Sequence, residues 1–483
     1  MVSSMADGDH LRREAGAGAL GRLAWFRREL YWCLWRRGDA LFELADAVLT
    51  AGRAGSLPYL SLEPGFRRGH GMIYQGLAEG GIDEEALRDL LVAARPAGWP
   101  LVFAVDASVY PRPEAECSPG REWHHHTCQG GHGRDEPVVA GWSFQWVAQL
   151  SFTRDCWTAP QDVVRTGVRD DQTRQAAEQV IAHAGRLRAA GERGIPLYVL
   201  DAGYSEAPLT WDLREYLDRV QILVRVRSDR VMYRDPPPRE PGQPGRPRKH
   251  SKDRFECRDP ATWGTPDQEL LVQDEQYGQV SVMSWGGLHP KLACRRKFGG
   301  FSGSPVIRCH LIRVTVTRLP GGRKAPKGPL WLWWAGPGMP DLDLCWRGYL
   351  HRFDIEHTLR FAKHDLGWDG AALRHPEQVT RWTWLIIAVL TQLRLARPAA
   401  EDHHHRWERR HKPGMLTPAR VRRDFGRLAA ITGTPASPPK PSRPGPGRPA
   451  GRTTTPATRH PVTRRTAQPR AKPPPATTSN TKG

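Results

Sequence analysis

Two unbroken apolar runs, each of strand length and each followed at once by an aspartate, constrain the fold of this chain most strongly. Leu101–Val105 leads into Asp106, and Ile195–Leu200 leads into Asp201. Short, wholly apolar runs are typical of strands buried on both faces of a sheet. If the two strands are parallel neighbours, both aspartates lie at the same edge, where α/β sheets place their ligand sites. One such Asp is a common turn residue, so the pair is the informative feature.

The segments around these runs predict a layered α/β sheet. The order along the chain is three strands, a helix, a strand, a helix and a strand, and strands that alternate with helices are typical of this class. Beyond the two apolar runs, the predicted elements are strands near 142–151, 156–158 and 221–226, a helix over 173–190 that Asp170 and Asp171 can cap, and a helix over 211–217.

Residues 1–98 are predicted to be helical. Apolar residues recur at helical spacing over Leu20–Leu49, and a second helix is expected over Ile82–Ala94, with Asp83 as its cap. The region is rich in arginine. Two interpretations stay open: a DNA-binding domain, and a helical cap packed on the next domain.

The helical pattern vanishes between residues 229 and 340, where Val306–Arg318 and Leu330–Trp334 are expected strands of a β-rich insertion. It resumes over 341–432. Within that part, Val379–Leu395 is the most apolar helix, but its uncharged run is shorter than the ~20 residues that span a bilayer. We therefore expect a buried helix there. The first twenty residues lack the apolar core of a secretory signal, and the eight scattered cysteines show no disulfide framework.

The charge of the chain points to a polyanionic partner. There are 71 Lys and Arg residues against 51 Asp and Glu, a net charge of +20. Ten of those cations lie in the Pro- and Thr-rich segment from residue 436 to the end, which has no acidic residue and is expected to be disordered. Gly447-Arg448-Pro449 resembles an AT-hook element that reads the minor groove, and Gly245-Arg246-Pro247-Arg248-Lys249 is similar. Nonspecific attraction to phosphates is the alternative role of the tail.

A stripe of polar side chains on one predicted helix points to chemistry rather than packing. At ~100° per residue, Tyr349, Arg352, Glu356 and Lys363 fall at about 0°, 300°, 340° and 320°, on one narrow face. A phenol, a guanidinium, a carboxylate and an ammonium make a poor core face. A surface helix with an Arg352–Glu356 ion pair is the simpler explanation, but it leaves Tyr349 and Lys363 unexplained.

The spacing Tyr349-x2-Arg352-x3-Glu356-x6-Lys363 resembles the Y-R-E-K signature of a large group of bacterial insertion-sequence DDE transposases. Asp201-Ala202-Gly203-Tyr204 is similar to their D-x-G-[FY] motif, and Phe103-Ala104-Val105-Asp106 resembles the strand that carries their first Asp. The resemblance implies an α/β, RNase H-like mixed sheet interrupted by a β-rich insertion. The implied domains are a helical, DNA-binding 1–98, core segments 99–228 and 341–432, the insertion 229–340 and a disordered basic tail 433–483.

The resemblance also implies the chemistry. Asp106, Asp201 and Glu356 are expected to be catalytic and to hold two Mg²⁺ ions, for which Mn²⁺ can substitute. Tyr349, Arg352 and Lys363 are expected to bind DNA phosphates. The implied activity is cleavage at transposon ends and strand transfer, with double-stranded terminal inverted repeats and target DNA as partners. A homodimer in the bacterial cytoplasm, associated with the nucleoid and not with a membrane, follows from it. Two alternatives remain: a catalytically inactive DNA-binding derivative, and a metal-dependent nuclease without strand transfer.

Four further groups of residues have weaker signals. The soft-ligand cluster Cys117, His124, His125, His126, Cys128 and His132 fits no zinc spacing, and a loop is the alternative. His403-His404-His405 is expected in a solvated linker, and Asp365 and Asp369 are rival carboxylates that lie off the stripe. An insertion tryptophan could stack a flipped base, but Trp331, Trp333, Trp334, Trp263 and Trp285 are not distinguished, and core packing is expected for the first three.

Overall fold

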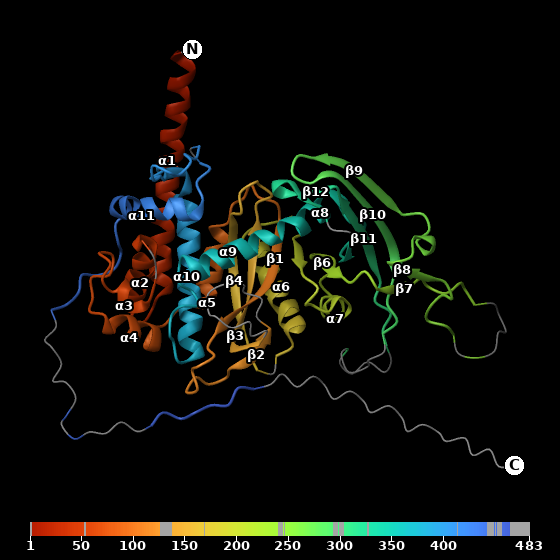
Figure 1. The fold of residues 1–483 in the computed structure, drawn as a ribbon, viewed down its shortest axis with the longest axis horizontal. Coiled ribbons are helices and arrows are strands. Elements are labelled where there is room, and N and C mark those ends of the chain that lie inside the picture. Colours follow the sequence, from red (N-terminus) through yellow and green to blue (C-terminus); the bar gives the residue numbers. More distant parts are fainter. Residues whose placement is uncertain are drawn as a thin grey trace.

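The computed structural model describes residues 2–52, 55–125, 138–168, 170–239, 245, 247–292, 298, 304–325, 328–412, 414–441, 449, 451 and 456–463. A ten-stranded sheet runs through the middle of this part of the chain. Helices from both ends of the chain gather at one end of the sheet, on the left of Figure 1, and the β-rich segment lies at the other.

The helical end combines the first and the last helices of the chain. Helix α10 lies inside it and contacts α1, α2, α4 and α11, so the apolar run from 379 to 395 is a buried helix, as predicted. No helix in the described ranges is long and apolar enough to cross a membrane. The helices are α1 (Val2–Cys33), α2 (Gly38–Thr50), α3 (Leu57–Leu60), α4 (Gly71–Glu79), α5 (Glu84–Ala93), α10 (Pro376–Ala396) and α11 (Pro418–Thr432), with a 3-10 turn η4 (Arg397–Ala399).

Buried polar contacts fix the N-terminal helices to the rest of the molecule. Arg27 of α1 donates to Asp46 of α2 at 2.7 Å, to Gln392 of α10 at 2.8 Å and to the carbonyl of Gly433 at 3.0 Å. Asp83 caps α5 as predicted, by accepting from the amide of Ala86 at 3.0 Å. The N-terminal helices are thus packed as a cap on the following part of the chain, and a DNA-binding role for them stays a prediction.

The sheet is mixed, with strand order β2-β3-β1-β5-β6-β14-β11-β10-β9 and with β4 paired to β3. β1, β5 and β6 are parallel to one another, and the other pairs are antiparallel. This is the α/β, RNase H-like mixed sheet that the sequence predicts. The strands are β1 (Val102–Pro111), β2 (Glu122–His125), β3 (Val138–Leu150), β4 (Thr158–Thr166), β5 (Leu197–Leu200), β6 (Gln221–Val226), β9 (Gln268–Asp274), β10 (Gly278–Leu288), β11 (Cys309–Val316) and β14 (Leu330–Ala335).

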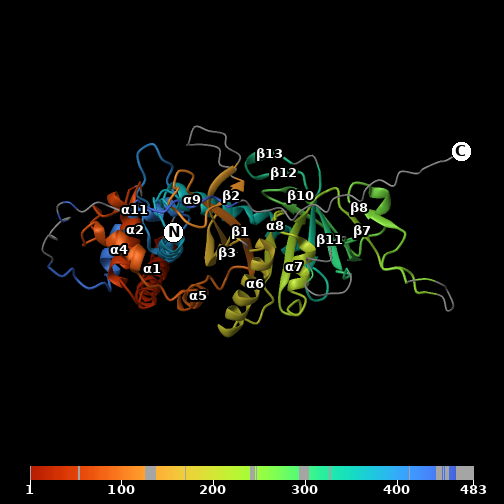
Figure 2. The ribbon, with the colours of Figure 1, turned by 90° about the horizontal axis from the view of Figure 1, so that it is seen from below.

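Alternate residues of β1 and β5 serve two separate cores, one on each face of the sheet. Val102 and Ala104 pack into the core formed with α8 (Leu342–His351), α9 (Phe353–His364) and α10, whereas Phe103 and Val105 pack into the core formed with α6 (Gln172–Ala189) and α7 (Glu206–Asp212). The period of two is that of a strand buried on both faces. Figure 2 gives a second view of α6 and α7 beside the sheet.

Several predicted boundaries shift. β1 continues through Asp106 to Pro111, so Asp106 lies within a strand rather than at its end. The strand expected over 156–158 begins at Thr158, and the helix expected over 211–217 is α7, which ends at Asp212. The cap of α6 is Asp171, which accepts from the amide of Thr173 at 2.9 Å, while Asp170 accepts from Gly167 instead.

The β-rich segment is not a separate sheet. β14 pairs with β6 of the core, with Trp333 opposite Val224, and β11, β10 and β9 follow outward from it. The insertion therefore extends the sheet that carries the aspartates. Its remaining elements are short: the pair β7 (Val231–Tyr233) and β8 (Arg254–Glu256), the pair β12 (Arg318–Leu319) and β13 (Arg323–Lys324), and the 3-10 turns η1 (Pro260–Thr262) and η3 (Pro320–Gly322).

Part of the C-terminal tail is an exception to the predicted disorder. The amide of Thr463 donates to the carbonyl of Arg121 at 2.9 Å, and its carbonyl accepts from Trp123 of β2. His460 donates to the carbonyl of Glu116 at 2.8 Å. The tail thus returns to the outer edge of β2. Of the AT-hook-like motifs, Gly447, Arg448 and Arg246 lie outside the described residues.

Candidate active site

Strand register places the two predicted aspartates side by side. In the parallel pair β1–β5, Val105 lies opposite Leu200, so Asp106 and Asp201 occupy the next positions on neighbouring strands. Both continue the period of the residues that face α8 and α9 (Val102 and Ala104 on β1, Leu197 and Val199 on β5). The two strands are parallel neighbours, which is the condition under which the two aspartates share an edge.

Local backbone contacts hold the Asp201 carboxylate. Its Oδ1 atom accepts from the amide of Gly203 at 2.8 Å, and a Cβ atom on Gly203 would stand 3.0 Å from the same oxygen. Glycine therefore lets the backbone approach the carboxylate closely. Tyr204 is buried and donates to Gln145 at 3.0 Å. The D-x-G-Y motif thus sets the Asp201 side chain and anchors the turn that follows it.

The third carboxylate comes from a helix pair rather than from one continuous helix. The predicted helix through Glu356 is divided at Arg352, which ends α8 and begins α9. The amide of Arg352 donates to the carbonyl of Tyr349, and the amide of Ile355 donates to the carbonyl of Arg352. Both hydrogen bonds span three residues rather than the four of an α-helix. This tight turn separates α8 from α9.

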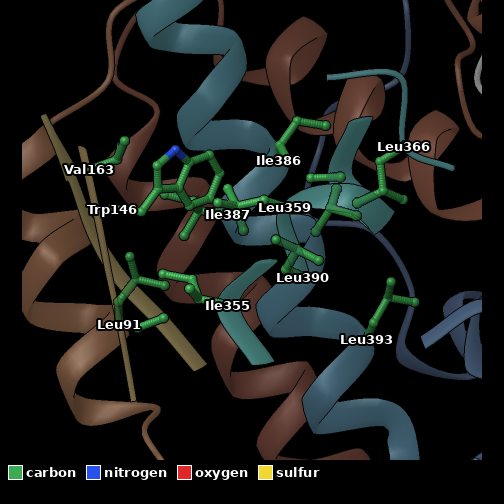
Figure 3. Close-up of a cluster of buried hydrophobic side chains, with 14 of the residues drawn as sticks. Leu91, Trp146, Val163, Ile355, Leu359, Leu366, Ile386, Ile387, Leu390 and Leu393 are labelled. Atoms are coloured by element: carbon green, nitrogen blue, oxygen red, sulfur yellow. The ribbon is translucent and has the colours of Figure 1, made fainter. Parts of the chain in front are cut away.

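The buried side of α9 is apolar and fixes the helix in place. Ile355 and Leu359 lie among side chains of α10 and of the sheet, including Ile387 and Trp146, as Figure 3 shows. Glu356 follows Ile355 directly, and its side chain is 44% exposed. Packing of the apolar residues thus leaves Glu356 at the margin of the core.

Arg352 connects the carboxylate of β1 to that of α9. Its Nη1 lies 3.4 Å from Oδ2 of Asp106, and its Nη2 lies 3.1 Å from Oε1 of Glu356. Arg352 is only 5% exposed, so its pair with Asp106 lies largely out of water, whereas Glu356 meets it from the margin of the core. The Arg352–Glu356 pair that the sequence predicts is present, but its guanidinium is buried and also bonds to Asp106, unlike that of a plain surface helix.

The negative charges of the cluster act on one another. Burial raises the pKa of Asp106 to about 6, with Arg352 opposing the rise and the charges of Asp201 and Glu356 adding to it. Burial disfavours the charged form of Arg352, but the neighbouring Asp106, Tyr349, Glu356 and Asp201 raise its pKa overall. Three acidic groups from β1, β5 and α9 therefore share one electrostatic environment around a single guanidinium.

The other two residues of the stripe are placed differently. Tyr349 is 2% exposed, and its hydroxyl has no hydrogen-bond partner of good geometry among the described residues. Burial raises the pKa of Tyr349, and the charges of Arg352 and Arg225 oppose the rise. Lys363 lies in the last turn of α9, with its ammonium 5.8 Å from the ring centre of Trp368. No described contact joins Lys363 to the carboxylates.

Arg225 is the residue that the sequence analysis missed. It lies on β6, where Val224 is opposite Leu200 of β5, so Arg225 occupies the position beside Asp201. No motif marks it. Its only sequence signal is a charged residue near the end of an otherwise apolar strand that follows the two Asp strands.

Among the described residues, the remaining candidates have no contact with the site. His126, Cys128 and His132 lie outside the described residues, and Cys117 contacts the tail at Ala457. His403 bonds to Asp424 at 2.8 Å, so the predicted linker is not wholly solvated. Trp331, Trp333 and Trp334 are buried, which confirms core packing for that cluster. No described contact links Asp365 or Asp369 to Asp106, Asp201 or Glu356.

A family model described as DDE superfamily endonuclease matches residues 29–291, more than half of the chain. The chain belongs to the DDE superfamily endonucleases. The match includes Asp106 and Asp201 and ends before Glu356. The chain is also similar to a solved structure described as a piggyBac transposase synaptic complex with hairpin DNA, with a TM-score of 0.36 and 9% identity over 83% of this chain and 74% of that chain. At that TM-score the likeness supports no further argument. No curated protein matches the chain.

Membership of the DDE superfamily endonucleases implies dependence on a divalent metal, and the donor set suits one. Asp106, Asp201 and Glu356 offer only oxygen atoms, which hard divalent cations prefer, and their mutual repulsion is of the kind that a cation offsets. Among the described residues, no group of three or more His, Cys, Asp or Glu side chains is gathered closely enough to hold an ion. Arg352 lies between two of the three carboxylates instead.

Proposed function

We propose that this DDE superfamily endonuclease is a transposase that cleaves DNA at the ends of an insertion sequence and joins those ends to target DNA. One observation carries the proposal: Arg352 is bonded to both Asp106 and Glu356, with Asp201 in the next position beside Asp106. Arg352 thus links two carboxylates from distant parts of the chain at the edge of the sheet where Asp201 also lies. The first step is hydrolysis of a phosphodiester bond, which frees a 3′-hydroxyl, and the second is attack of that hydroxyl on target DNA.

Asp106, Asp201 and Glu356 would hold the metal ions, proposed to be two Mg²⁺ with Mn²⁺ able to replace them. When bound, such ions activate the attacking oxygen and stabilise the leaving oxygen of an in-line displacement. The turn at Gly203 holds the Asp201 oxygens in place, and Arg352 keeps Asp106 and Glu356 together despite their repulsion. The protein's own share of the catalysis is therefore positioning and neutralisation of charge.

We extend the proposal to the rest of the stripe, in which Tyr349, Arg352 and Lys363 bind DNA phosphates. A guanidinium suits two-point contact with a phosphate, and an ammonium acts as a point charge. Double-stranded terminal repeats and target DNA are the proposed partners, bound in part by residues 1–98 and by the basic tail. Two transposon ends must be brought together, so the proposed active form is a homodimer, acting in the bacterial cytoplasm on the nucleoid.

The experiment is cleavage of DNA that carries the flanking repeats, with Mg²⁺, by the wild type and by Asp106→Asn, Asp201→Asn and Glu356→Gln. Each substitution keeps the shape and removes the charge, so we expect loss of at least about 100-fold in rate. Asp369→Asn is the matched control, because it removes a carboxylate just beyond α9, and it should cleave normally. Cleavage by Asp201→Asn at the wild-type rate would contradict the proposal.

The same assay separates the alternatives. An inactive derivative would bind the repeats without cutting them in any metal. A nuclease would cut without producing joined products when target DNA is supplied. Lys363→Ala is the second test: we expect weaker binding or cutting of the ends with an unchanged circular-dichroism spectrum, and unchanged cutting would remove Lys363 from the DNA contacts.

A further inference from the structure

Arg225 completes a row of three side-chain positions across neighbouring strands. Val105, Leu200 and Val224 are opposite one another on β1, β5 and β6, so Asp106, Asp201 and Arg225 hold the next positions. Leu223 packs into the core on the α8 side of the sheet. Side chains two residues apart on a strand lie on the same face, so Arg225 is on the α8 side as well. Arg225 is exposed. A cation therefore lies one strand away from a proposed catalytic aspartate, on the face where the chemistry is proposed.

Arg225 also lines a hollow in the surface. A cavity of about 610 Å³ extends from the turn after Asp201, at Ala202 and Gly203, past Arg225 and Arg227 to Tyr233 and Lys291. A second hollow of about 340 Å³ shares Ala202, Arg225 and Arg227 with the first and reaches Arg258. The two form one continuous depression that begins at the Asp201 turn and runs between β6 and the insertion.

Four of the cations in this depression have no acidic partner among the described residues. Arg225, Arg227, Arg258 and Lys291 have no carboxylate within ion-pair distance in the part of the chain that the structure describes. Arg230 differs, since it pairs with Glu206 at 2.5 Å. Asp229 is the other acidic residue of the lining. Five cations against two anions leave a net positive surface, and unpaired cations held near each other favour an anionic ligand.

We infer that this depression binds a single DNA strand beside the scissile phosphate, with Arg225 and Arg227 as residues that position its phosphates. The inference rests on the proposed function and adds a path for the strand. The volume matches that of a small-ligand pocket, roughly the bulk of one or two nucleotides. A duplex, whose major groove alone is about 12 Å wide, is too broad to enter it. Single-strand sites combine basic side chains with aromatic rings on which bases stack, and Tyr233 supplies a ring in the wall.

The test measures binding without cleavage. Full-length protein in EDTA is titrated against a fluorescein-labelled single-stranded oligonucleotide and against a blunt duplex of the same sequence, at several salt concentrations. The variant is Arg225→Ala with Arg227→Ala. The matched control is Arg219→Ala, which removes an exposed arginine that precedes β6, at the opposite end of the strand from Arg225. The basic tail is the same in all three proteins, so its contribution is constant.

We expect the double variant to bind the single strand about tenfold more weakly than wild type and control, with the slope of log affinity against log salt smaller by about 1.4, or 0.7 for each phosphate contact. The affinity of the double variant for the duplex should fall by about threefold at most. Equal losses on both DNAs would mean a duplex surface, and no loss on the single strand would mean that the depression is not the site. Either result overturns the inference.

A second readout places the strand directly. An oligonucleotide that contains 5-iodouracil is irradiated with the wild type, and the crosslinked residue is mapped by mass spectrometry. A crosslink at Tyr233 that disappears in the Arg225/Arg227 variant supports the site, and crosslinks confined to residues outside the depression overturn it. If these results hold while no protein cleaves DNA, the proposed catalysis fails and the strand site stands. If Asp201→Asn loses cleavage but the Arg225/Arg227 variant binds the single strand as the wild type does, the proposed catalysis stands and the strand site fails.

Discussion

The guanidinium of Arg352 lies 3.4 Å from the carboxylate of Asp106, although 246 residues separate the two along the chain. One belongs to the junction of α8 and α9, and the other to the centre of β1. The same guanidinium reaches Glu356 at 3.1 Å. The contact therefore joins the strand part and the helix part of the proposed site, and it offsets the repulsion among three acidic groups. The stability of the fold and the proposed catalysis therefore depend on the same few atoms.

Removing Arg352 should destabilise the metal-free protein. Arg352→Gln leaves Asp106 buried without its cation, and breaking a largely buried pair in this way costs about 3 kcal/mol of unfolding free energy. Urea unfolding in EDTA at pH 7.5 measures it. Adding Asp106→Asn to Arg352→Gln should restore most of the loss, because the one carboxylate of the cluster that still lacks this cation, Glu356, has a side chain that is 44% exposed. Equal instability of the single and double variants would show that the pair does not hold the cluster together.

Asp106→Asn alone should stabilise the metal-free protein at neutral pH. Asp106 has a pKa of about 6 in the fold against an ordinary value of 3.8. Below pH 4 the carboxyl is protonated in both states. As the pH rises from about 4 to about 6, the unfolded chain loses its proton first, so wild-type stability falls, and above pH 6 the loss is constant. The variant lacks this cost, which a rise in pKa from 3.8 to about 6 makes about 3 kcal/mol.

Thermal unfolding of both proteins between pH 4 and pH 8 measures the difference. The melting temperature of Asp106→Asn should exceed that of the wild type above pH 6, and the gap should close toward pH 4. A gap that does not change with pH would show that burial of the charge is not its cause. Cleavage should be lost in the variant at every pH.

The sequence could predict the parts of the site that local patterns encode. The two apolar runs indicated strands buried on both faces of a sheet, because only such strands lack polar alternation. If those strands are parallel neighbours, their aspartates share one edge. The spacing of Arg352 and Glu356 indicated their contact, which needs only one turn of helix. Arg225 could not be found in this way, because its place beside Asp201 depends on the pairing of β5 with β6.

Two other features depend on contacts that leave little trace in the side-chain pattern. β14 extends the core sheet through backbone hydrogen bonds to β6, and the tail near Thr463 pairs with the edge at β2 in the same way. Backbone donors and acceptors are alike in nearly every residue. The Pro- and Thr-rich composition of the tail predicts disorder. Composition does not show that another part of the chain has an exposed strand edge with which the tail can pair.

Acid should weaken the fold through His183. This side chain is fully buried, with Nδ1 2.8 Å from the Tyr198 hydroxyl and Nε2 2.8 Å from Oε1 of Gln161, and burial lowers its pKa to about 3. As the pH falls below 6.5, the unfolded chain binds a proton that the folded chain excludes, so stability drops by about 1.4 kcal/mol per unit. The loss at pH 5 relative to pH 7.5 should be about 2 kcal/mol.

Urea unfolding of the wild type and of His183→Gln at these two values tests the assignment. The variant retains hydrogen-bonding groups and cannot titrate, so its loss between the two pH values should be smaller by that amount. Other titratable groups contribute equally in both proteins. The difference between the two losses of unfolding free energy is therefore due to His183. An identical pH dependence in the two proteins would rule out this source.

The N-terminal helices should unfold together with the sheet, through Arg27. This guanidinium is 2% exposed and bonds to Asp46 and to Gln392, so Arg27→Met leaves a buried carboxylate on α2 and a broken link to α10. The expected loss is about 3–5 kcal/mol of unfolding free energy. Arg28→Met is the matched control, since Arg28 is exposed and pairs only with its neighbour Glu29, and it should cost less than about 0.5 kcal/mol. Similar losses in the two variants would indicate that the first helices fold on their own, as a separate DNA-binding domain would. A large difference would instead make them part of the support of α10, against which the apolar side of α9 is packed.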